Sequence, residues 1–127
     1  MVTSILDISP EKVSHYRTAA LRRLEEESTE MARRKESAWK SARRAARLLK
    51  EHFHATRVAI FGSLVRDGCF TRWSDVDIAA WGILPEETFR AIGAVLDSDK
   101  SFEINLVDVN ACKPSLLEII QREGVDL

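Results

Sequence analysis

Two aspartates alternate with apolar residues in the segment Asp75-Val-Asp-Ile78. On a strand, this spacing places Asp75 and Asp77 on one face while Val76 and Ile78 point into the core. Their Cβ atoms would lie roughly 6–7 Å apart, close enough for the carboxylates to converge on metal ions about 3.5–4 Å from each other. Unpaired carboxylates repel, so a hard cation such as Mg²⁺ would relieve the site. By itself, such a pair is more typical of the solvent-facing edge of an amphipathic strand.

A second polar segment, Phe61-Gly-Ser63, precedes the acidic pair at a predicted strand-to-helix turn. Gly62 allows the backbone to approach a ligand closely, and the N–H groups of a helix that starts near Ser63 would face a phosphate. Ser63 adds a hydroxyl donor. Alone, this dipeptide indicates only a turn. A phosphate cradle beside a carboxylate pair that binds metal is, however, the arrangement that a nucleoside-triphosphate transferase needs.

The elements that position these residues are predicted from alternating strand and helix patterns. β-prone runs bounded by turn residues occupy 57–61, 75–81 and 102–109. Helical patterns occupy 85–96, where Phe89, Ile92 and Leu96 are spaced for one buried face, and 114–122. We therefore predict an α+β fold of two layers, in which a small mixed β-sheet carries helices on one face.

A long helix is predicted before this core. Ser9 is a suitable N-cap, Pro10 fits the first helical position, and apolar residues then recur at three- and four-residue steps as far as Phe53. The pattern thins between Glu25 and Glu36, which leaves a bend or break open there. A continuous helix of about 44 residues would be about 66 Å long, whereas a remainder of some 70 residues has a radius of gyration near 11 Å. Its far half must fold back, pair with a second copy or bind another protein.

Composition and charge limit the classes of function. The 127 residues are 45% hydrophobic with a net charge of −1, the sum of +5 over residues 1–57 (13 basic, 8 acidic) and −6 over residues 58–127 (6 basic, 12 acidic). In the basic half acids are interleaved and aromatics are few, so a solvated helix is favoured over nucleic-acid binding. No apolar run suits a membrane span, and Cys69 and Cys112 form neither a disulfide framework nor a metal knuckle. We expect a reduced, cytoplasmic globular protein.

The residues from Phe61 to Arg66 and from Trp73 to Ile78 resemble the GS…DxD signature of the DNA polymerase β-like nucleotidyltransferase superfamily. The segments 104–109 and 119–125 look like those of its minimal, MNT-type branch. This resemblance covers roughly residues 42–127. We therefore divide the chain into an N-terminal helical extension, 1–41, which contacts a partner or a second copy, and a minimal nucleotidyltransferase domain, 42–127.

The resemblance implies transfer of a nucleoside monophosphate from a nucleoside triphosphate, usually ATP, to a hydroxyl group, with release of pyrophosphate. Gly62 and Ser63 would hold the β- and γ-phosphates, and Asp75 and Asp77 would bind two Mg²⁺ ions. Two further residues are assigned to nucleotide binding, namely Arg66 and Ser74. For Arg66, pairing with Asp67 or Asp75 is an equal alternative.

One position departs from the family pattern. Where the family usually places a third aspartate on the later strand, this sequence has Asn105, which offers an oxygen to Mg²⁺ but neither a negative charge nor a base. Glu103, two residues earlier on the same face, could substitute, whereas Asp108 has the opposite parity and would point away. We expect a weakened, redirected or inactive enzyme.

The same branch includes the antitoxins of MNT/HEPN toxin–antitoxin modules, which adenylylate a tyrosine on a helical HEPN ribonuclease. This resemblance implies a HEPN-type toxin as the partner, and the overlong helix suits such a contact, although a homodimer through that helix explains it equally well. The alternative function is an antitoxin that neutralises its partner by binding alone. Trp73 and Trp81 flank the DxD strand and are assigned to packing, with Trp73 bordering a nucleotide base as the alternative.

Overall fold

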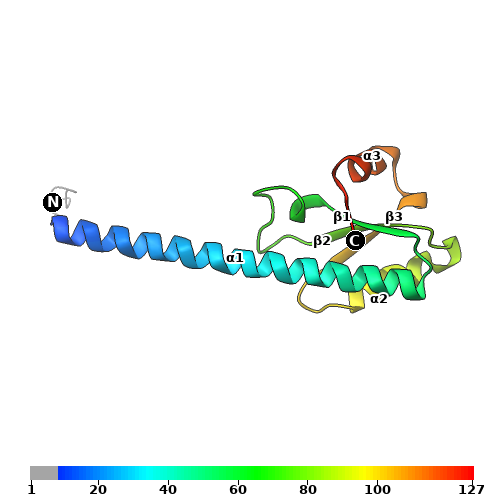
Figure 1. The fold of residues 1–127 in the computed structure, drawn as a ribbon, viewed down its shortest axis with the longest axis horizontal. Coiled ribbons are helices and arrows are strands. Elements are labelled where there is room, and N and C mark those ends of the chain that lie inside the picture. The colour runs from blue at the N-terminus through cyan, green and yellow to red at the C-terminus, as the bar shows by residue number, and fades with distance from the viewer. Residues whose placement is uncertain (1–8) are drawn as a thin grey trace, which may run out of the picture. The chain divides into compact units, whose positions relative to one another are not determined.

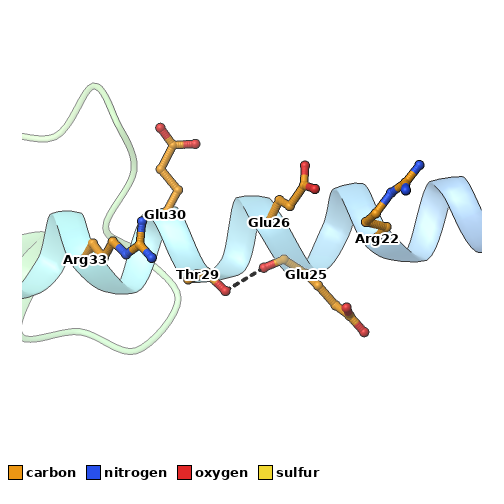
Figure 2. Close-up of a pocket in the computed structure, with 6 residues that line it drawn as sticks. All are labelled: Arg22, Glu25, Glu26, Thr29, Glu30 and Arg33. Atoms are coloured by element: carbon orange, nitrogen blue, oxygen red, sulfur yellow. Dashed lines mark hydrogen bonds between the residues drawn. The ribbon is translucent and has the colours of Figure 1, made fainter.

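One helix, α1 (Pro10–His52), opens the part of the chain that the computed structural model describes, residues 9–127 (Figure 1). Its start is capped as predicted, because the backbone N–H of Lys12 donates to Ser9 Oγ at 3.2 Å and Pro10 occupies the first helical position. The helix is continuous from Glu25 to Glu36, where the thin apolar pattern allows a bend or break. Figure 2 shows that segment, where Glu26 and Glu30 extend from the helix and Thr29 Oγ1 donates to the Glu25 carbonyl at 2.9 Å.

The chain divides into two compact units, one ending at Arg33 and one spanning Arg34–Leu127. This division lies earlier than the predicted domain boundary at residue 41, because Ala38 and Ser41 are already buried within the second unit. In the first unit, the described residues from Pro10 onward are helical, and nearly all of their side chains are exposed. Across residues 9–127, no helix combines the length and the apolar character needed to cross a membrane.

A mixed four-stranded sheet forms the centre of the second unit. Its strands are β1 (Arg57–Phe61), β2 (Val76–Trp81), β3 (Ile104–Asp108) and β4 (Val125–Asp126), in the order β3-β2-β1-β4. β1 runs antiparallel to β2 and β4, whereas β2 and β3 are parallel. The three predicted strands and the α+β class are confirmed. β4 was not predicted, because two exposed residues are too few to show a strand pattern.

Helices cover both faces of this sheet. Figure 1 shows the strands between α3 (Pro114–Glu123) on one side and α2 (Thr88–Asp97) with the later part of α1 on the other. On the α3 side, Ile120 packs with Phe61, Ala79 and Val109. Helices therefore cover two faces of the sheet, whereas the prediction placed them on one. Trp81 also packs against the cluster under α3, which confirms the packing role predicted for that tryptophan.

The later part of α1 packs through small side chains. Ala38, Ala42 and Ala45 are fully buried, as is Leu49. Side chains of this size let a helix approach its neighbours closely, and burying them costs little conformational entropy. The second unit therefore includes this part of α1 in its core.

The buried face of α2 differs from the predicted one. Phe89 was expected to be buried, yet 88% of its surface is exposed. A short 3₁₀ turn, η3 (Pro85–Glu87), precedes the helix. The fully buried residues of α2 are Ala91 and Val95, which lie one helical turn apart. Thr88, at the start of α2, donates to Asp108 Oδ2 at 2.7 Å.

A buried aspartate joins α1 to the loop before β3. The Asp99 side chain, only 5% exposed, accepts hydrogen bonds from Ser41 Oγ, from Arg44 at 2.9 Å, and from the backbone N–H groups of Ser101 and Phe102. Burial alone would raise the pKa of Asp99, but the four donors together hold it below its usual value of 3.8. The ionised carboxylate therefore stabilises the fold.

We expect Asp99→Asn to lower the free energy of unfolding at pH 7 by about 2 kcal/mol, because it removes the charge from this set of hydrogen bonds. A carboxyl whose pKa is lowered by folding contributes stability above its unfolded pKa and loses it as pH falls through the folded one. The difference from wild type should therefore shrink below pH 3.8. Urea denaturation across this pH range measures it.

Asp126→Asn is the matched control, because Asp126 pairs with Arg57 at 2.7 Å and its side chain is 66% exposed. An exposed ion pair contributes about 0–1 kcal/mol. Equal losses of unfolding free energy for the two variants at pH 7 would contradict a stabilising role of the ionised Asp99 carboxylate. A loss for Asp99→Asn that does not change with pH would contradict it as well.

Candidate active site

Three polar residues meet where neighbouring strands end. Asp75 directly precedes β2, Asp77 is its second residue, and Asn105 is the second residue of β3. The parallel register pairs Asp77 with Asn105, and the antiparallel register pairs Asp77 with Phe61, the last residue of β1. The sheet thereby brings the acidic pair, the amide and the turn after β1 to one edge.

The side chain of Asn105 lies between the two carboxylates. Its Nδ2 is 3.4 Å from Asp75 Oδ2 and 3.4 Å from Asp77 Oδ1. One amide nitrogen carries two N–H donors, so each carboxylate can accept one of them. The two carboxylates therefore converge on the amide nitrogen of Asn105.

The electrostatics of the site favour neutralisation of its charge. Burial raises the pKa of Asp77 above its usual value of 3.8, and the negative charge of Asp75 raises it further, while the hydrogen bond from Asn105 opposes both. Two carboxylates held this close repel each other in the absence of a counter-charge. Binding of a proton or of a cation therefore relieves the electrostatic repulsion in the site.

The residues present fit Mg²⁺ that is shared with a phosphate ligand. The donor set consists of the two carboxylates, which are hard oxygen ligands, and Asn105 turns its amide nitrogen toward both of them. Within residues 9–127, no group of three or more His, Cys, Asp or Glu side chains could hold a metal ion. Mg²⁺ is commonly bound by one or two carboxylates together with water and substrate phosphates, so the pair is sufficient for that mode of binding.

Gly62 contacts the acidic pair through its backbone. Its φ is +82°, and a Cβ at this position would lie 2.6 Å from Asp77 Oδ2. Both the conformation and the close approach require glycine. The turn after β1 is thereby held directly against a carboxylate of the site.

The element that follows Gly62 is shorter than predicted. Instead of a helix that starts near Ser63, the chain forms one 3₁₀ turn, η2 (Gly62–Leu64), with Leu64 buried. A second turn follows shortly afterwards, where Gly68 has a φ of +73°. The predicted helix at Ser63 is therefore wrong, and any phosphate contact there depends on local N–H groups and the Ser63 hydroxyl.

The structure does not bring Arg66 to the carboxylate pair. Its Nε donates to Glu123 Oε2 on α3 at 3.0 Å, so neither predicted partner, Asp67 or Asp75, is the one observed. Glu123 lies 57 residues away in sequence, and no local pattern indicated the pairing.

The two other polar residues considered from sequence have local contacts. Ser74 Oγ accepts from the backbone N–H of Thr71 at 2.9 Å, which closes a tight turn immediately before Asp75. Glu103 is exposed, and its carbonyl accepts from the Val76 N–H at 2.9 Å. Glu103 thus helps to fix the register of β2 against β3 beside the site.

Sequence reasoning missed a residue that anchors this turn. Arg34 on α1 donates to the Arg72 carbonyl at 2.9 Å, and its guanidinium lies 4.8 Å from the centroid of the Phe102 ring. Trp73, which follows in the turn, is 81% exposed, so the packing role predicted for it is wrong. Nothing local in the sequence could have revealed the anchor, because Arg34 and Arg72 are 38 residues apart.

Known proteins resemble this chain in structure. No family model and no curated protein matches the sequence. Among solved structures, the chain is similar to a candidate minimal nucleotidyltransferase, at 25% identity over 73% of this chain and 95% of that one, with a TM-score of 0.58. It is also similar to a toxin–antitoxin structure with AMP-PNP, at 20% identity over 64% of this chain and 67% of that one, with a TM-score of 0.54. The chain thus has the minimal nucleotidyltransferase fold, as its motifs predicted.

We expect Gly62→Ala to abolish binding of Mg²⁺–ATP and to lower stability by more than the roughly 1–2 kcal/mol of backbone strain alone. The added methyl group would displace Asp77 from its position next to Asn105. Isothermal titration calorimetry and thermal unfolding measure the two effects.

Gly68→Ala is the matched control, since Gly68 has a similar φ of +73° but nothing within 4 Å of its would-be Cβ. Its backbone strain should lower stability by an amount comparable to the backbone strain in Gly62→Ala, and it should keep nucleotide binding. If both variants bind Mg²⁺–ATP like wild type, the contact between Gly62 and Asp77 has no role in the site.

Proposed function

We propose that this protein is a Mg²⁺-dependent nucleotidyltransferase that moves AMP from ATP to a tyrosine hydroxyl of a HEPN-type toxin in the cytoplasm, and so acts as an antitoxin. The observation that carries the proposal is the convergence of Asp75 and Asp77 around Asn105 Nδ2, at 3.4 Å from each, beside the backbone of Gly62. The similarity in fold to a toxin–antitoxin structure with AMP-PNP supports it.

Each residue of the site has a proposed role. Asp75 and Asp77 hold Mg²⁺, up to two ions, which when bound neutralises the negative charge that develops on the phosphates. The backbone at Gly62 and the hydroxyl of Ser63 orient the β- and γ-phosphates. Ser74 fixes the turn that presents Asp75, through its hydrogen bond with Thr71. Arg66, whose Nε donates to Glu123, supports phosphate charge through its remaining guanidinium N–H donors.

The proposed transfer breaks one bond and forms one. The tyrosine oxygen forms a bond to the α-phosphorus, the bond between that phosphorus and the bridging oxygen to the β-phosphate breaks, and pyrophosphate leaves. The hydroxyl proton passes to water, because the neutral amide of Asn105 cannot accept it. Without a positioned base at this point the transfer is slow, since general bases typically contribute a factor of 10²–10⁴ in rate.

We expect Asn105→Asp to increase the rate of AMP transfer and to increase the stabilisation by Mg²⁺. Without metal the variant should unfold at a lower temperature, because a third carboxylate replaces the amide that donates to the other two. Thermal unfolding with and without Mg²⁺, together with transfer rates at saturating ATP, measures both effects.

Asn110→Asp, on the 3₁₀ turn after β3, is a control for added charge alone, and it should change neither the rate nor the response to Mg²⁺. An unchanged transfer rate for Asn105→Asp would mean that Glu103, or no residue, supplies the base.

A second candidate function is neutralisation of the toxin by binding alone. It is favoured by the amide at position 105 and by the first unit, where apolar side chains of α1 are exposed: Val13 (39%), Tyr16 (65%), Leu21 (54%) and Leu24 (60%). We propose that this surface binds the toxin or the same helix of a second copy. Either contact would remove apolar area from water, which stabilises the complex by about 25 cal/mol for each Å² buried.

The two functions differ in one measurement, the intact mass of the toxin after co-expression with this protein. An increase by one or more AMP units is expected with wild type, and none with the Asp75→Ala/Asp77→Ala variant. An unmodified toxin that still co-purifies with both would support neutralisation by binding. If the toxin is neither modified nor bound, both functions are refuted and only the fold remains.

A further inference from the structure

The most exposed aromatic residue beside the carboxylate pair is Trp73, two residues before Asp75. Of its surface, 81% is accessible. Phe89 on α2 is as exposed, but α2 lies on the sheet face opposite to α3, whereas Trp73 belongs to the turn that leads into the site. An exposed tryptophan forgoes a large stabilisation by burial, so its position calls for a physical reason.

The backbone that carries Trp73 is held in one conformation. The Trp73 N–H donates to Thr71 Oγ1 at 3.2 Å, and the Ser74 N–H donates to the Thr71 carbonyl at 3.1 Å. Together with the bond from the Thr71 N–H to Ser74 Oγ, these contacts close the turn on itself. Trp73 is therefore presented to solvent by an ordered turn rather than by a loose loop.

The turn is also fixed to the body of the second unit. Arg34 donates to the Arg72 carbonyl at 2.9 Å, and Phe102, against which the Arg34 guanidinium stacks, is only 6% exposed. An anchor of this kind holds the backbone that carries the indole at a constant position relative to the rest of the unit. A preorganised aromatic group binds a planar ligand with little loss of conformational entropy.

The surroundings of the indole suit an anionic ligand with a planar ring. The Arg72 guanidinium lies 5.1 Å from the centroid of the Trp73 ring, which steadies the ring and places a positive charge beside it. At 81% exposure, most of the ring remains open to a ligand. Because Trp73 and Asp75 are two residues apart in sequence, their Cα atoms lie no more than about 7 Å apart, a length comparable to that of a nucleoside between its 5′ oxygen and its base.

We infer that Trp73 is the platform on which the base of the nucleoside triphosphate stacks, while its phosphates lie at the carboxylate pair. This inference rests on the proposed function. It assigns base binding to a residue outside the GS and DxD motifs, and it makes recognition tolerant of base identity, because stacking uses the π-face that every base possesses.

The test compares binding of ATP with binding of inorganic tripolyphosphate, which has no base, to the full-length protein in Mg²⁺ by isothermal titration calorimetry. Trp73→Ala should weaken ATP binding about tenfold or more and leave tripolyphosphate binding within twofold of wild type. Trp73→Phe, which keeps a π-face, should retain most of the affinity for ATP. Phe89→Ala, which removes an equally exposed aromatic side chain elsewhere, should change neither affinity.

Two outcomes overturn the inference and leave the proposed function standing. One is a Trp73→Ala variant that binds ATP like wild type, and the other is an equal loss of ATP and tripolyphosphate binding in that variant. An unchanged affinity for ATP with reduced toxin modification would reassign Trp73 to partner docking. If wild type binds neither ATP nor tripolyphosphate, the proposed function fails and the inference fails with it.

Discussion

The backbone of Gly62 lies against a carboxylate of Asp77, and the rest of the site depends on this contact. The contact follows from the antiparallel register of β1 and β2, in which Phe61 pairs with Asp77. A shift of one residue in this register would turn Asp77 toward the other face of the sheet. Buried apolar residues on both strands, such as Ile60 and Ile78, prevent such a shift. The hydrophobic core thereby fixes the distance between the glycine turn and the acidic pair.

The same arrangement makes the ionised form of one site residue, Asp77, electrostatically unfavourable. The sheet holds Asp77 where burial and the charge of Asp75 both disfavour its ionised form. Asp99 illustrates the opposite case, because four donors surround it and its ionised form is favoured. A buried carboxylate with a full set of donors stabilises a fold, whereas one that is short of them favours a ligand that supplies the missing charge.

The parts of the site that could be predicted from sequence are those set by short-range patterns. The alternation of acidic and apolar residues placed Asp75 and Asp77 on one face of a strand. Asn105 was indicated by the resemblance to nucleotidyltransferases, because it stands where that pattern has a third aspartate. The N-cap of α1 is also local, since Ser9 and Lys12 are three residues apart. Within such a distance, the geometry of one turn or one strand determines which groups meet.

The parts that could not be predicted depend on tertiary contacts. The partner of Arg66 is Glu123 and not its acidic neighbour Asp67, because α3 brings Glu123 back to β1. The exposure of Phe89 follows from where the 3₁₀ turn ends and α2 begins, a boundary that apolar spacing alone does not locate. Trp73 is 81% exposed, and its turn is anchored by Arg34, which lies 38 residues from Arg72 in sequence.

The anchor from Arg34 has a consequence for how modular the molecule is. The helix that precedes the nucleotidyltransferase motifs supplies a contact to the turn before Asp75, and Ala38 and Ser41 of the same helix are buried in the core. A transplant of residues 42–127 onto another scaffold would therefore separate the motifs from part of their own support. The helix from Arg34 onward and the site belong to one compact unit, so an exchange of the N-terminal segment would have to keep those helical residues.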